Sequence, residues 1–93
     1  MSSDPELLQL RAAMDATNRR LVDALHDRAR LCRTIGRWKQ ARGLAAEDPA
    51  REAAMLDELL RLCPADGLPP AALATVLRAV FAASRALVAE PTM

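Results

Sequence analysis

Large aromatic and β-branched residues are scarce in this chain of 93 residues. It has no Tyr, one Trp and one Phe, and Ile and Val together number five, against 20 Ala and 15 Leu. Because Ala and Leu favour helices, whereas sheets draw on β-branched and aromatic residues, a β-sandwich or a parallel sheet is nearly excluded. The composition predicts one small all-α domain, spanning 1–93, with a core of Ala and Leu.

Patterns typical of metal sites and disulfide scaffolds are also missing. The two cysteines, Cys32 and Cys63, lie far apart with no CxxC spacing, and the single His cannot complete a metal cluster with them. We therefore expect two buried free thiols, no bound metal and no disulfide framework.

Signals for a membrane or for export are absent as well. No stretch reaches the roughly 20 uncharged apolar residues that a membrane span needs, and the opening MSSDPE lacks the basic region of a signal peptide. Lys plus Arg is 13 and Asp plus Glu is 12, so the net charge of +1 argues against a nucleic-acid binder. We expect a cytoplasmic protein without nucleic-acid or membrane partners.

Proline, glycine and acidic caps divide the chain into three predicted helices. The first covers about 5–42, the second 48–63 and the third about 69–89. An Asp-Pro pair opens each of the first two, where Asp caps the helix and Pro fits its first turn. Gly43 ends the first helix.

The first predicted helix is too long for the domain that contains it. Nearly 40 helical residues span roughly 55 Å, whereas a compact chain of this length has a radius of gyration of about 13 Å. Its apolar stripe continues through Leu7, Leu10, Met14, Leu21, Leu25, Cys32 and Ile35. A second chain must cover the overhang, which predicts an interlocked homodimer. The alternative is a helix that bends back at Gly36, where glycine costs about 1 kcal/mol.

Several polar residues fall on the apolar faces of these helices, at about 100° per residue. They are Arg28, Lys39, Glu52 and Ser84, with Arg11 and Arg85 at the margins. Unpaired buried charges are costly, so these groups need partners. Two interpretations stay open. The groups pair with one another, for example Arg28 with Glu52, or they line a pocket with surplus positive charge for a small anion that has more than one carboxylate.

No pair of nucleophile and base is visible, and there is no Gly-rich phosphate loop. Ser84 has no His in helical register, while His26 and Trp38 lie at or off the edge of the apolar stripe and are better explained by packing. Any chemistry in the pocket would therefore depend on positioning and on electrostatic stabilisation of a bound anion.

The Leu10-Arg11 pair, the segment MDATNRRLVDALHDRARLCRTIGRWKQ, the run Asp48-Pro49-Ala50-Arg51-Glu52 and Ser84 resemble the all-helical chorismate mutases. An LR pair, an Arg, an IGxxK and a DxxRE occur in order and without a gap, over nearly the whole chain. The resemblance implies a dimer of three-helix protomers, with two active sites that combine residues of both chains. It implies an isomerase that rearranges chorismate to prephenate without a cofactor.

The same resemblance implies a role for each site residue. Arg28 and Arg11 of the partner subunit would grip the two carboxylates of the substrate. Lys39 would hydrogen-bond the ether oxygen and a carboxylate. The ring hydroxyl would be held by Glu52 and the backbone at Asp48. The supporting residues would be Arg51 near that hydroxyl, Ser84 at a carboxylate, and Ile35, Met55 and Phe81 as walls around the ring.

One position departs from the family's pattern. One turn beyond Ser84 the family usually has Gln or Glu, a second donor to the ether oxygen, and this chain has Val88. Losing such a donor costs about 3 to 4 kcal/mol of transition-state stabilisation. We expect Lys39 to act alone, or Arg85 to replace the donor in part or to grip a carboxylate.

The choice of substrate stays open at the level of sequence. One alternative is 4-amino-4-deoxychorismate, whose ammonium would replace the ring hydroxyl beside Glu52. Others are release of pyruvate from isochorismate, and a helical dimer without catalysis. Dependence on a partner enzyme is also open.

Overall fold

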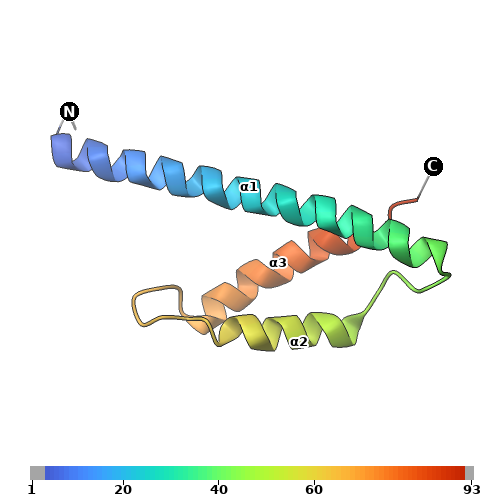
Figure 1. Ribbon diagram of the computed structural model, residues 1–93. Helices are drawn as coiled ribbons and strands as arrows, with labels where there is room; N and C mark the ends of the chain where they lie inside the picture. Colours follow the sequence, from blue (N-terminus) through green and yellow to red (C-terminus); the bar gives the residue numbers. More distant parts are fainter. Residues whose placement is uncertain (1–3, 92–93) are drawn as a thin grey trace.

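The computed structural model describes residues 4–91, and these form three α-helices and no strand (Figure 1). The helices are α1 (Pro5–Ala41), α2 (Pro49–Leu60) and α3 (Pro70–Val88). The predicted all-α class and the order of the helices are confirmed. Residues 1–3, which open the segment MSSDPE discussed above, lie outside the described residues.

Asp-Pro pairs begin α1 and α2, as predicted. The carboxylate of Asp4 accepts a hydrogen bond from the backbone N–H of Glu6 at 2.8 Å, and that of Asp48 accepts one from Arg51 at 3.0 Å. Each carboxylate satisfies an N–H that the first turn of a helix leaves without an intrahelical partner. Asp48 thereby fixes the start of α2 beside the site described below.

α1 ends in a Schellman motif. Gly43 adopts a φ of 65°, and its N–H donates to the carbonyl of Gln40 at 3.2 Å, while the N–H of Leu44 donates to the carbonyl of Lys39 at 2.9 Å. Glycine takes this left-handed conformation without a steric cost. The motif turns the chain out of α1 and into the loop that leads to α2.

α2 ends three residues before the predicted Cys63. Turn hydrogen bonds at Arg61 and Leu62 replace the helical pattern. Pro64 disfavours the helical conformation at the preceding residue, Cys63, so the helix ends before Cys63.

α1 is a single uninterrupted helix, and the alternative of a bend at Gly36 is wrong. Gly36 is buried where the end of α3 crosses α1, and a Cβ atom at this position would overlap the carbonyl oxygen of Val88. The glycine therefore serves a close approach of two backbones. This contact sets the position of the last turn of α3.

The molecule is elongated because α1 extends far beyond the other helices (Figure 1). Its extents are 58 × 31 × 16 Å and its radius of gyration is 17.5 Å, against about 13 Å for a compact chain of this length. α3 packs against α1 and α2 packs against α3. The buried apolar residues are few within the described part, namely Cys32, Ala74 and Phe81.

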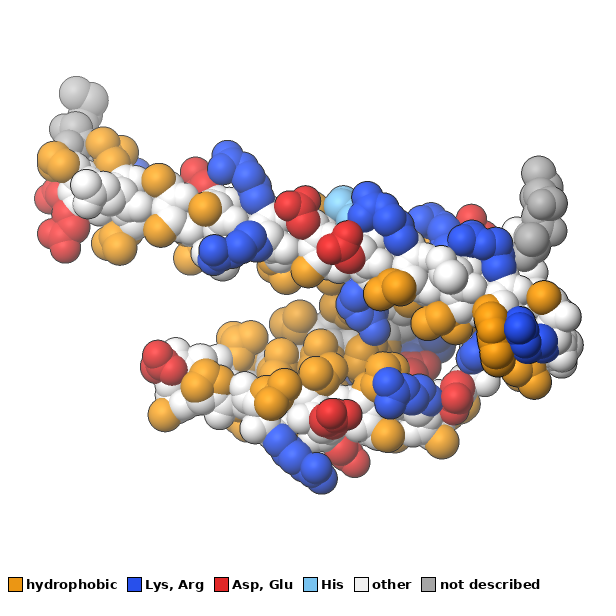
Figure 2. All heavy atoms as spheres, in the orientation of Figure 1, with side chains coloured by type: hydrophobic (Ala, Val, Ile, Leu, Met, Phe, Trp, Pro, Cys, Tyr) orange, Lys and Arg blue, Asp and Glu red, His pale blue; other side chains and the backbone are white. Residues whose placement is uncertain are grey.

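The apolar stripe of α1 is exposed in the isolated chain. Leu10, Met14 and Leu21 are 61%, 60% and 56% exposed. Figure 2 shows hydrophobic side chains along the underside of α1 and on the facing side of the other two helices. The predicted overhang is thus confirmed, and it carries more exposed Leu and Met than a single folded chain normally does.

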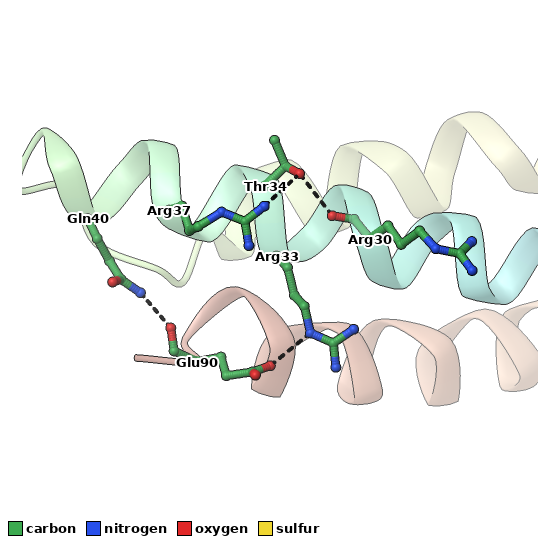
Figure 3. Close-up of polar contacts among 6 residues, drawn as sticks. All are labelled: Arg30, Arg33, Thr34, Arg37, Gln40 and Glu90. Carbon is green, nitrogen blue, oxygen red and sulfur yellow. Dashed lines mark hydrogen bonds and ion pairs between the residues drawn. The ribbon is translucent and has the colours of Figure 1, made fainter. Parts of the chain in front are cut away.

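Polar contacts hold the segment that follows α3 against α1 (Figure 3). Nε of Arg33 donates to Oε2 of Glu90 at 3.1 Å, and the side-chain amide of Gln40 donates to the backbone carbonyl of Glu90 at 2.7 Å. Exposed contacts of this kind contribute little stability individually. They nevertheless act two residues beyond Val88 and reinforce the crossing at Gly36.

Two further features of the fold bear on the expectations above. Both cysteines are free thiols. The expected burial is confirmed for Cys32, which is buried, and is wrong for Cys63, which is half-buried. α3 has the length and apolar composition to cross a membrane, yet it carries Arg78 and Arg85 and packs against both other helices. Length and composition alone are weak grounds for a membrane assignment, because core helices share them.

Gly36→Ala tests the close approach. Glycine to alanine in a helix normally stabilises by about 0.5–1 kcal/mol. Here the added methyl meets the backbone of Val88, so we expect the free energy of unfolding to fall by about 1–3 kcal/mol. Urea denaturation followed by circular dichroism, at one fixed protein concentration, measures this free energy of unfolding. A variant more stable than the parent would show that the two backbones do not approach closely at this point.

Candidate active site

A cavity of about 200 Å³ lies where the three helices and the α1–α2 loop meet. It brings together eight of the nine predicted site residues: Arg28, Lys39, Asp48, Arg51, Glu52, Ser84, Arg85 and Val88. The three residues expected to form walls around the ring, Ile35, Met55 and Phe81, line it as well. All the polar positions inferred from helical periodicity, except Arg11, therefore line one cavity.

Arg28 reaches from α1 to α3. Its Nη1 donates to Oγ of Ser84 at 2.7 Å, and its guanidinium carbon lies 5.4 Å from the centroid of the Phe81 ring. The Ser84 hydroxyl donates in turn to the carbonyl of Val80 at 2.8 Å. Ser84 therefore positions the guanidinium, and the face of the aromatic ring stabilises its charge.

The predicted alternative in which Arg28 pairs with Glu52 is wrong. None of the ion pairs found within residues 4–91 involves Arg28, and Glu52 pairs with another cation. Arg28 is half-buried, and no carboxylate among residues 4–91 forms an ion pair with it.

Lys39 is the second half-buried cation of the cavity. Its Nζ donates to the backbone carbonyl of Ala46, in the α1–α2 loop, at 3.2 Å. It too lacks an ion-pair partner in the part of the chain that the structure describes. A half-buried ammonium that is bonded to one carbonyl retains donors for an anionic or electron-rich oxygen.

Glu52 of α2 pairs with Arg85 of α3, with Oε1 and Nη1 2.5 Å apart. The side chain of Glu52 is 24% exposed and that of Arg85 is 48% exposed, so solvent screens the pair in part. Arg85, placed at the margin of its helix by periodicity, turns inward as its length allows. In this structure it binds the carboxylate of the protein itself.

Arg11 is the one predicted site residue that lies away from the cavity. It is exposed on the N-terminal part of α1. Arg11 and Arg28 are seventeen positions apart in the sequence, which corresponds to roughly 25 Å along the helix axis. Within one chain, Arg11 and Arg28 therefore do not meet.

Three residues of the cavity wall were not predicted as site residues: Cys32, Ala46 and Glu47. Cys32 lies one helical turn beyond Arg28 and one before Ile35, so its place on the stripe was a usable signal. Ala46 and Glu47 belong to the loop, which has no periodicity from which to infer a direction.

Comparisons with known proteins point to one family. The profile of the family described as Chorismate mutase type II matches residues 10–89, which include the whole cavity. A T-protein from Enterobacter agglomerans is 37% identical over 76 residues, which cover 82% of this chain and 20% of that protein. This chain thus spans about a fifth of that relative's length.

A solved structure agrees over nearly the full length of both chains. It is the structure of chorismate mutase (form II) from Thermus thermophilus, and the comparison gives a TM-score of 0.86 at 31% identity. The match covers 95% of this chain and 99% of the other. On the family match and the fold, the chain belongs to the chorismate mutase type II family.

Proposed function

We propose that this protein is a chorismate mutase, an isomerase that rearranges chorismate to prephenate in the cavity between its helices. The observation that carries the proposal is a pair of half-buried cations, Arg28 and Lys39, that line one cavity and lack a carboxylate partner within residues 4–91. Burying a positive charge costs free energy unless an anion pairs with it. A substrate with two carboxylates supplies that anion.

The reaction is a Claisen rearrangement within one molecule. A carbon–oxygen bond breaks while a carbon–carbon bond forms, so no nucleophile, proton acceptor or second substrate takes part. The enzyme needs to hold the extended ether in a compact conformation and to stabilise negative charge that gathers on the ether oxygen in the transition state. The cavity offers groups for both tasks.

In the proposed arrangement, Arg28 binds one carboxylate, and Ser84 keeps the guanidinium in place. Lys39 donates to the ether oxygen, where the developing charge makes the hydrogen bond stronger in the transition state than in the ground state. The carbons of the ring lie against Ile35, Met55 and Phe81. These apolar walls exclude water and so strengthen the electrostatic interactions.

Glu52 accepts a hydrogen bond from the ring hydroxyl in this proposal. Asp48 and Arg51 lie at the start of α2, beside Glu52, and fix the direction in which this turn faces the cavity. The backbone at Asp48 supplies a further contact to the hydroxyl. Binding at this end sets the orientation of the ring relative to Lys39.

The proposed active form is a cytoplasmic homodimer with interlocked α1 helices. The exposed apolar stripe of α1 supports a second copy as its cover. In such a dimer Arg11 of the partner subunit binds the second carboxylate. This placement accounts for an arginine that its own chain carries far from the cavity.

Lys39→Met tests the charge at the ether oxygen. Removing one preorganised donor typically lowers the rate by about 10²–10³-fold, and we expect kcat/KM to fall by about that factor. The measurement is the loss of chorismate's ultraviolet absorbance, with identification of the product. Arg37→Met is the matched control, because Arg37 is exposed on the same helix and bonds Thr34 outside the cavity. Equal loss in both variants would argue against the assigned role.

Val88→Gln tests the missing second donor. Val88 lines the cavity and offers no hydrogen bond, and the guanidinium of Arg85 is engaged by Glu52. An amide at this position reaches the same region as Lys39, so we expect kcat/KM for chorismate to rise by about tenfold or more. Ala82→Gln places the same amide on the exposed side of α3 and should change nothing. No gain in Val88→Gln would mean that the substrate lies in a different pose.

Mixing two inactive variants tests the shared site. In a dimer of Arg11→Ala with Arg28→Ala chains, one site carries both defects and the other carries neither. Random pairing after refolding together should therefore restore about a quarter of the parent activity. Sedimentation velocity supplies the oligomeric state. A monomeric protein, or a dimer whose mixed variants regain nothing, would contradict the proposed assembly.

A further inference from the structure

The ion pair between Glu52 and Arg85 bears on which ring substituent the site accepts. We propose that Arg85 is a specificity-determining residue that makes this end of the cavity select a neutral hydroxyl over a cationic ammonium. The inference rests on the proposed function, in which Glu52 faces the ring substituent. The inference predicts that the site prefers chorismate to its 4-amino analogue. The sequence alone left this choice of substrate open.

The hydrogen bonding of the pair suits a hydroxyl. Oε1 of Glu52 is taken by Nη1 of Arg85, whereas Oε2 has no hydrogen-bond partner within residues 4–91. A carboxylate oxygen accepts hydrogen bonds and cannot donate them. One free oxygen is sufficient for a hydroxyl, which needs a single acceptor.

The charge around Glu52 disfavours an ammonium. A lone carboxylate would attract a cationic substituent, but Arg85 already balances the charge of Glu52 and repels a second cation. The wider lining adds to this effect, because its four cations outnumber its three carboxylates. The cations are Arg28, Lys39, Arg51 and Arg85, and the carboxylates are Glu47, Asp48 and Glu52. A hydroxyl-bearing dianion suits this surplus better than a zwitterion with one more positive charge.

A second role for Arg85 makes a different prediction. If its guanidinium left Glu52 to donate to the ether oxygen, its removal would lower the turnover of both substrates alike. The ring substituent does not react, so selection at Glu52 instead acts as uniform binding and changes KM more than kcat. The ratio of the two kcat/KM values therefore distinguishes selection from catalysis.

The experiment compares purified parent, Arg85→Met and Arg85→Lys proteins with chorismate and with 4-amino-4-deoxychorismate. We expect the parent to prefer chorismate. Arg85→Met should raise the relative kcat/KM for the amino substrate by about tenfold, a moderate factor because the pair is partly screened. Most of the change should lie in KM. Arg85→Lys keeps the charge and should keep most of the preference.

Two controls isolate the local charge. Arg78→Met removes an exposed cation on the same helix, two turns before Arg85, that forms no ion pair within residues 4–91. This substitution should leave the ratio of the two kcat/KM values unchanged. Raising the salt concentration should weaken the preference of the parent and leave that of Arg85→Met nearly constant, because salt screens exposed charges. Circular dichroism confirms that each variant is folded.

The outcomes separate this inference from the proposed function. A parent that prefers the amino substrate, or an Arg85→Met variant with the parent's ratio, overturns the selection by Arg85 while the mutase activity stands. An equal shift in Arg78→Met overturns it too, because the effect would then be one of net charge. A parent that turns over neither substrate overturns the proposed function and this inference together.

Discussion

The close crossing of α3 over α1 at Gly36 is the constraint on which the site depends. α3 packs against α1, and the absence of a side chain at Gly36 brings the backbone of Val88 against it. This crossing holds the last two turns of α3 in one register relative to α1. That register places Ser84 opposite Arg28 and closes the cavity at Val88, and a shift of one turn would separate them.

The positive charge of the cavity results from the kinds of partner that its charged side chains have. Arg85 and Glu52 satisfy each other, whereas Arg28 is bonded to a hydroxyl and an aromatic face, and Lys39 to a backbone carbonyl. Neutral partners orient a cation without cancelling its charge. The positive charge is therefore positioned before any ligand arrives, which suits a reaction that needs electrostatic stabilisation and a restricted conformation.

The hydrophobic core of a single chain is small, and this links the active site to the proposed dimer. So few apolar residues are buried within the described chain that the long α1 cannot be explained by packing inside one protomer. An exposed stripe of Leu and Met on a helix is stable in water when another surface covers it. The proposed dimer would bury the stripe and deliver Arg11 of the partner subunit by the same contact, so stability and catalysis would share one interface.

Local patterns in the sequence determined the helices, their caps and the residues that face inward, because capping chemistry and periodicity act within a few neighbouring residues. These patterns placed Arg28, Lys39, Glu52 and Ser84 on the inner faces of the helices. They did not identify the residues to which these side chains bond. The tertiary structure decided that Glu52 pairs with Arg85 and Arg28 with Ser84, and that Gly36 marks a crossing instead of a bend. Such choices depend on the register between helices far apart in the chain, and no period within one helix encodes that register.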